Sequence, residues 1–121
     1  MIHNSSKNTV LAKKIRYCDT FLKRGTGLMF RFRFRDEGYI FSFKRDIIAA
    51  IHMLFVFFPI DIIWLDEKKQ VVEMRENIWP FTLSVIPNRK SRYFIEVPKN
   101  TIKKTRTAVG DQLGWTEKKE K

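Results

Sequence analysis

The residues from Ile47 to Leu65 form the most apolar part of the chain and restrict its fold more than any other feature. Within them, residues 47–60 contain no Asp, Glu, Lys or Arg. That charge-free stretch is too short for a membrane-spanning helix, which needs about 20 apolar residues. Asp61 follows directly, and Pro59 would break or kink a helix at this place. We therefore predict two buried strands, at 51–55 and 60–65, and no membrane span.

The rest of the chain consists of short alternating or apolar runs separated by turn residues. Strands are predicted at 9–12, 13–17, 31–35, 39–43, 71–75, 82–85, 93–97 and 112–115, with polar turns at 36–38, 44–46, 66–69 and 110–111. Short helices are expected at 20–24, capped by Asp19, and at 101–107, capped by Asn100. Such closely spaced short strands indicate a mostly β, single-domain antiparallel or mixed β-sandwich, or a partly closed barrel, with one or two short helices.

The chain has 121 residues, the size of one domain, and its 44% hydrophobic content excludes a disordered protein. We expect a flexible N-terminus over 1–8, a single β domain over 9–115 and a charged tail over 116–121. The N-terminus has no apolar stretch typical of a secretory signal peptide, which predicts a cytoplasmic protein. The single cysteine, Cys18, excludes an internal disulfide.

Several landmarks occur in an order that resembles a known family. They are Gly27-Leu28-Met29-Phe30-Arg31, Asp36-Glu37-Gly38, the block 51–66, Glu96-Val97-Pro98 and Val109-Gly110-Asp111. Together they resemble the domain of unknown function 192 family, also called uncharacterised protein family 0127, over about residues 9–115. His52 and Leu54-Phe55-Val56 replace a Trp and a Lys-Asn-Thr found in many bacterial members, which resembles the archaeal branch. The resemblance implies a compact, mostly β fold and carries no assigned activity.

Residues able to carry chemistry are few. No Cys or His pair has the spacing of metal ligands, and no Gly-x-Ser-x-Gly elbow occurs, so no catalytic residue, metal or cofactor is expected and an enzyme is not favoured. Asp61 lies in apolar surroundings and needs a partner there, such as backbone N–H groups or an Arg. The alternative is a small-molecule pocket near His52, Met53 and Asp61, with or without catalytic activity, in which Asp61 contacts the ligand.

The net charge is +11, and residues 1–45 carry eleven Lys or Arg against three acidic residues. Basic residues interleaved with aromatic ones suit nucleic acid, because cations neutralise phosphates and exposed rings stack on bases. The candidate anion-binding residues are Arg31, Arg33, Arg35, Lys23, Arg24, Lys44 and Arg45. A second basic set comprises Arg89, Lys90, Arg92, Lys99, Lys103, Lys104 and Arg106.

If the two basic sets meet on one side of the domain, they indicate a binding surface, whereas dispersed charge mainly maintains solubility. The preferred hypothesis is a non-enzymatic binding or accessory domain for an anionic partner, either nucleic acid or another polyanion. A protein–protein module with an exposed apolar patch is a further alternative.

Overall fold

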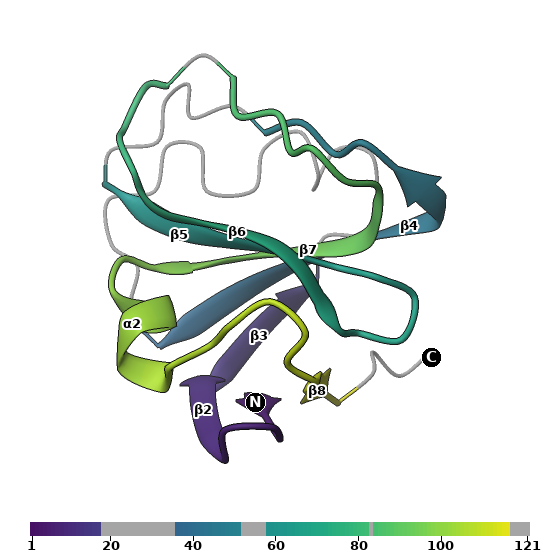
Figure 1. Cartoon of the computed structure of the whole chain (residues 1–121). Coiled ribbons are helices and arrows are strands. Elements are labelled where there is room, and N and C mark those ends of the chain that lie inside the picture. The colour runs from purple at the N-terminus through teal and green to yellow at the C-terminus, as the bar shows by residue number, and fades with distance from the viewer. Residues whose placement is uncertain (18–35, 52–57, 83, 117–121) are drawn as a thin grey trace.

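Within the part of the chain that the structure describes, a five-stranded mixed sheet with the order β3-β4-β7-β5-β6 forms the centre of the protein (Figure 1). The structure, a computed structural model, describes residues 1–17, 36–51, 58–82 and 84–116. The strands of this sheet are β3 (Lys14–Tyr17), β4 (Glu37–Ile47), β5 (Ile60–Leu65), β6 (Val71–Ile78) and β7 (Ser91–Pro98). β3 runs parallel to β4, and every other neighbouring pair is antiparallel.

A smaller sheet and a short helix cover the lower face of this central sheet. The smaller sheet has the order β2-β1-β8 and consists of β1 (Ile2–Asn4), β2 (Thr9–Ala12) and β8 (Leu113–Trp115). The helix is α2 (Thr101–Thr105), which follows β7 directly. Figure 1 shows residues 47–51 and 84–90 passing over the opposite, upper face. The described chain is therefore mostly β, as its sequence predicts, with two sheets.

β5 is buried along its whole length because it lies between β7 and β6 and is covered on both faces. Its side chains alternate between two cores. Ile62 and Trp64 contribute to the upper core and Ile63 and Leu65 to the lower one. A strand covered on both faces has a nearly continuous run of apolar residues, which explains the hydrophobicity of this segment.

The upper core is built around stacked aromatic rings. The rings of Phe41 and Phe94 lie parallel with their centroids 4.3 Å apart. Trp64 donates a hydrogen bond of 3.0 Å from its indole N–H to the carbonyl of Ala49, which fixes residues 47–51 over the sheet. Residues 47–51 also contact the chain between β6 and β7 through a bridge from Ile51 to Val85.

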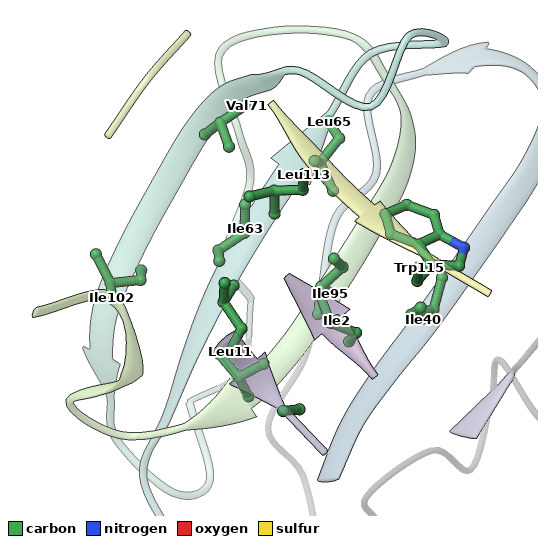
Figure 2. Close-up of a cluster of buried hydrophobic side chains, with 12 residues drawn as sticks. Ile2, Leu11, Ile40, Ile63, Leu65, Val71, Ile95, Ile102, Leu113 and Trp115 are labelled. Atoms are coloured by element: carbon green, nitrogen blue, oxygen red, sulfur yellow. The ribbon is translucent and has the colours of Figure 1, made fainter. Parts of the chain in front are cut away.

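The lower core packs aliphatic side chains of the central sheet against β1, β2, α2 and β8 (Figure 2). Ile2, Ile63, Ile95 and Leu113 are all within it and are essentially inaccessible to solvent. Burying each such side chain contributes about 1.5–3 kcal/mol. A side chain at Gly38 in β4 would collide with the Cδ1 atom of Ile2 and force this buried side chain to move.

The strands of the central sheet begin or finish at one of two ends. At the end that we call the α2 end, β4 begins at Glu37, β5 begins at Ile60, and β7 reaches Pro98 before the chain enters α2. The opposite edge, with Ile47 paired to Ser91, is the far end.

The antiparallel hairpin formed by β5 and β6 confirms the predicted turn at 66–69. The strands expected at 9–12 and 60–65 have the predicted bounds. The helix expected at 101–107 is shorter, Thr101–Thr105, and the Asn100 side chain makes no capping hydrogen bond. The expected helix at 20–24 and the expected strand at 31–35 lie outside the described residues.

One predicted turn was wrong. Residues 44–46 are not a turn but part of β4, where a bulge sets residues 43–46 of β4 against Arg92 of β7 and leaves the polar side chains in solvent. The strand predicted at 13–17 is present as β3 and pairs in parallel with β4. At the N-terminus, residues 2–4 form strand β1, in which Ile2 and Asn4 are fully buried.

Candidate anion-binding site at the α2 end

Asp61 fastens the elements of the α2 end together. It points from β5 to the lower face and is completely buried. Its Oδ1 accepts a hydrogen bond of 2.9 Å from the backbone N–H of Asn77 at the end of β6. Its Oδ2 accepts one of 3.0 Å from the N–H of Ile102 in α2. Because both oxygens are engaged by backbone donors, the geometry gives Asp61 a structural task and leaves it poorly placed to contact a ligand.

A pocket of about 390 Å³ opens between β2 and α2. It is lined by Val10, Leu11, Asp36, Pro98, Lys99, Thr101, Lys104 and Thr105. Thr9 Oγ1 donates to the carbonyl of Thr105 at 3.0 Å and so connects the two walls. The β3 side is connected as well, because Lys14 N–H donates to the carbonyl of Asp36 at 2.9 Å.

The basic residues at this end come from both halves of the sequence. They are Lys13 and Lys14 beside the start of β3, and Lys99, Lys103, Lys104 and Arg106 in or next to α2. All six are exposed, and no ion pair within the described part of the chain involves any of them. The register of β3, β4 and β7 thus brings part of the first basic set beside part of the second.

The far end is also basic but is partly neutralised. Lys44 and Arg45 are exposed at the bulge of β4. Arg92 pairs with Asp46 at 3.1 Å and lies 4.0 Å from Glu67. At the far end acidic side chains thus pair with part of the positive charge, whereas the six basic residues of the α2 end make no ion pair within the described residues.

Exposed aromatic side chains follow β6 at the α2 end. Trp79 is 70% exposed and Phe81 is 50% exposed. The turn that carries them is closed by Thr82, whose N–H and hydroxyl both donate to the carbonyl of Trp79. The Asp61 hydrogen bond to Asn77 places this turn at the α2 end of the sheet. Neither aromatic residue was among the site candidates, although an isolated Trp-Pro-Phe after a polar strand end was a usable signal.

Most of the predicted site residues cannot be placed. Lys23, Arg24, Arg31, Arg33, Arg35, His52 and Met53 lie outside the described residues, as does Cys18. Of the predicted anion-binding residues, Lys44 and Arg45 are described, and they lie at the far end rather than near the pocket.

Glu96 is a second buried carboxyl group that the sequence analysis did not single out as a site residue. It lies in β7 between Tyr39 of β4 and Ile62 of β5, on the face of the upper core, and is 7% exposed. Burial raises its pKa from 4.5 to about 8, so the carboxyl group is neutral at pH 7. The signal for it was an acidic residue within the apolar run 93–97.

Asp111 fixes the contact between the two chain ends on the lower side of the molecule. Its Oδ2 accepts from Asn4 Nδ2 and from the N–H of Ala108, both at 2.9 Å, and Lys7 Nζ bridges both carboxylate oxygens. Burial by itself would raise the pKa of Asp111, but the hydrogen bonds from Asn4, Lys7 and Ala108 and the charge of Lys7 outweigh it. The pKa is therefore lower than the ordinary 3.8.

Two further findings concern the described residues alone. None of their His, Cys, Asp and Glu side chains gather in a group of three that would suit a metal ion. No helix within 1–17, 36–51, 58–82 and 84–116 has the length and hydrophobicity needed to cross a membrane.

The fold and this basic end define a small two-sheet β domain with a polar pocket beside its helix. Residues 2–115 match the model of the family DUF192, described as "Uncharacterized ACR". The chain belongs to this family, as its landmarks predict.

Archaeal relatives are similar to nearly the whole chain. A UPF0127 protein of Pyrococcus horikoshii is 34% identical over 115 residues, covering 95% of this chain and 98% of the relative. One of Pyrococcus furiosus is 33% identical over 113 residues, covering 93% and 95%. One of Thermococcus gammatolerans is 34% identical over 125 residues, covering 100% and 80%.

Two bacterial crystal structures share the fold. One, from Sinorhizobium meliloti 1021, is described as that of a candidate transcription regulator. It has a TM-score of 0.79 and 22% identity, covering 83% of this chain and 79% of its own. The other, a protein of unknown function from Novosphingobium aromaticivorans DSM 12444, also has a TM-score of 0.79 and 22% identity, covering 84% and 74%. At this identity they establish the fold alone.

Proposed function

We propose that this protein is a non-enzymatic binding domain for an anionic macromolecule, with single-stranded nucleic acid as the partner and the cytoplasm as its compartment. The observation that carries the proposal is the gathering of six exposed Lys and Arg residues at the α2 end, with no ion pair to them within the described chain. Unpaired surface cations release counterions when they meet phosphates, which favours binding. Arg31, Arg33 and Arg35 remain part of the proposal as further cations of the same class.

Exposed rings at the same end favour a single strand over a duplex. Trp79 and Phe81 are presented on a closed turn, where 70% of Trp79 and 50% of Phe81 are exposed to solvent. Bases that are not paired stack on such rings regardless of their sequence. A duplex would offer its phosphates but not its base faces.

The proposal is tested by fluorescence anisotropy with single-stranded RNA labelled at its 3′ end, at about 50 and about 200 mM salt. The double variant Lys99→Ala, Lys104→Ala removes two cations from the pocket. We expect about ten-fold weaker binding at the lower salt and a salt slope reduced by about 1.4, since each contact to a single strand contributes about 0.7. The triple variant of Arg31, Arg33 and Arg35 to Ala is expected to weaken binding in the same way.

The matched control is Lys68→Ala, Lys90→Ala, which removes the same charge from exposed positions at the far end. It should change the affinity less than about two-fold. Absence of binding at the lower salt would exclude a nucleic acid partner. If the control loses as much RNA affinity as Lys99→Ala, Lys104→Ala does, binding depends only on net charge. That result would overturn the assignment of the α2 end as the binding site.

A further inference from the structure

We infer that the pocket between β2 and α2 binds a ribose phosphate, the chemical group at the phosphorylated end of a nucleic acid strand and also of free sugar phosphates. A ribose phosphate ligand deepens the proposed function. It rests on that function only where the ribose phosphate is the end of a nucleic acid strand. The pocket, at about 390 Å³, is within the range of small-ligand sites, about 300–1,000 Å³.

The polar groups of the pocket divide into cations and acceptors. Lys99 and Lys104 supply two ammonium groups, which suit a phosphate. Asp36 supplies a carboxylate, which accepts hydrogen bonds only. A ligand that satisfies all three carries a negative group together with hydroxyl or amine donors.

The threonine hydroxyls extend the acceptor side. Thr101 Oγ1 donates its proton to the carbonyl of Pro98 at 2.6 Å, and Thr105 Oγ1 donates to the carbonyl of Thr101 at 2.7 Å. Thr105 then accepts the hydroxyl proton of Thr107 at 2.7 Å, because its own proton is already committed. The lone pairs that remain on Thr101 and Thr105 can only accept from a ligand, which favours a ligand with several hydroxyl groups.

The apolar part of the lining suits a sugar ring. Leu11, Pro98 and the half-exposed Val10 supply the nonpolar part of the lining. A ribose phosphate combines an anion, hydroxyl donors and a weakly polar ring in one molecule. Bare phosphate would offer the Asp36 carboxylate no hydroxyl donor, and the two anions would repel each other within the same pocket.

The test uses ribose 5-phosphate as ligand, followed by backbone amide NMR shifts and by calorimetry. We expect shifts at Leu11, Thr101 and Thr105, and tighter binding than for inorganic phosphate or ribose. Lys99→Ala should weaken binding about ten-fold, because a charge-assisted contact is lost. Lys68→Ala, at the far end, is the matched control and should have no effect.

Asp36→Asn separates recognition of the sugar from simple attraction of charge. Asn tolerates the left-handed backbone of this position, where φ is 50°. The substitution raises the net charge by one unit, so attraction alone predicts tighter binding of every anion. Loss of a charged acceptor predicts instead about five-fold weaker binding of ribose 5-phosphate, with inorganic phosphate bound no less tightly. Unchanged or tighter binding of the sugar phosphate would overturn the inference, as would amide shifts away from the pocket.

Single-stranded RNAs with a 5′-phosphate and with a 5′-hydroxyl distinguish the two sources. At least five-fold tighter binding of the phosphorylated strand, a preference lost in Lys99→Ala, would identify strand ends as the source. If ribose 5-phosphate binds but neither RNA does, the pocket serves free sugar phosphates and the proposed function fails while the inference stands. If both RNAs bind equally and ribose 5-phosphate does not bind, the proposed function stands and the inference fails.

Discussion

The carboxylate of Asp61 accepts a hydrogen bond of 3.0 Å from the backbone N–H of Ile102, although the two residues lie 41 positions apart in the sequence. The other oxygen holds Asn77 at 2.9 Å. One buried side chain therefore positions both the helix that carries Lys103 and Lys104 and the strand end that leads to Trp79. The basic and aromatic parts of the candidate site depend on this contact for their relative placement.

Replacement of Asp61 by Asn should destabilise the protein by about 1–3 kcal/mol, because one backbone N–H would then face an amide donor instead of an oxygen. Urea denaturation of both proteins measures the difference. Asp46→Asn, at an exposed residue paired with Arg92, is the control and should cost less than about 0.5 kcal/mol. A loss for Asp61→Asn as small as that of the control would contradict the structural assignment.

Glu96 should make the protein less stable as the pH rises. Its pKa is 4.5 when exposed and about 8 when folded, so between these values the folded protein binds a proton that the unfolded chain has released. The stability from this group is complete below pH 4.5, declines by up to about 1.4 kcal/mol per pH unit, and is lost by about pH 8.

Glu96→Gln should remove this decline and make the protein more stable than wild type at pH 8, as measured by thermal unfolding from pH 4 to pH 9. Glu76→Gln, on the exposed part of β6, should leave the pH profile unchanged. Parallel profiles for wild type and Glu96→Gln would show that the Glu96 carboxyl group has an ordinary pKa.

The sequence predicts those parts of the fold that depend on local patterns. β5 and the 66–69 turn were predicted correctly because an unbroken apolar run beside a polar tetrapeptide has few other arrangements. β1 was not predicted, because its three residues lie between β2 and β8 and pair both with Ala12 and with Trp115, at the other end of the chain. The bulge at 43–46 depends likewise on the register against β7.

The candidate site was less predictable than the fold for the same reason. Asp36 and Lys99 line one pocket although 62 residues separate them, because β4 begins where β7 ends. The excess of basic residues in 1–45 is visible in the sequence. That some of them lie beside the second basic set follows only from the order of the strands in the sheet. Asp61 was correctly identified as a carboxylate in need of partners, while the identity of those partners, Asn77 and Ile102, depended on tertiary contacts.

The stability that Asp111 contributes should depend on pH in the opposite way from that of Glu96. Because its folded pKa is lowered below 3.8, its stabilising effect is present above that value and is lost as the pH falls through the folded pKa. Asp111→Asn should cost about 2 kcal/mol at pH 7, from loss of the charged contacts to Lys7 and Asn4.

Urea denaturation at pH 7 and again in strong acid measures this difference. The gap between wild type and Asp111→Asn should narrow in acid, where both side chains are neutral. The control is Asp66→Asn, which alters a carboxylate whose hydrogen bonds come from the backbone N–H groups of Lys68 and Gln70 rather than from a lysine ammonium group. A gap for Asp111→Asn that stays constant with pH would mean that its charge contributes nothing.

Trp79 should report directly on nucleic acid binding. It is the most exposed of the three tryptophans, since Trp64 is fully buried and Trp115 nearly so. Stacking of a base on its ring should quench its fluorescence, and Trp79→Ala should weaken binding of single-stranded RNA about five-fold or more, because such stacking is worth about 1–3 kcal/mol per base. The melting temperature should hardly change, because little of this ring is buried.

Val109→Ala, which trims another exposed apolar side chain, is the control and should leave the affinity unchanged. RNA binding that neither quenches Trp79 nor weakens in Trp79→Ala would exclude the aromatic turn from the binding surface and leave the lysines of the α2 end as its sole described contacts.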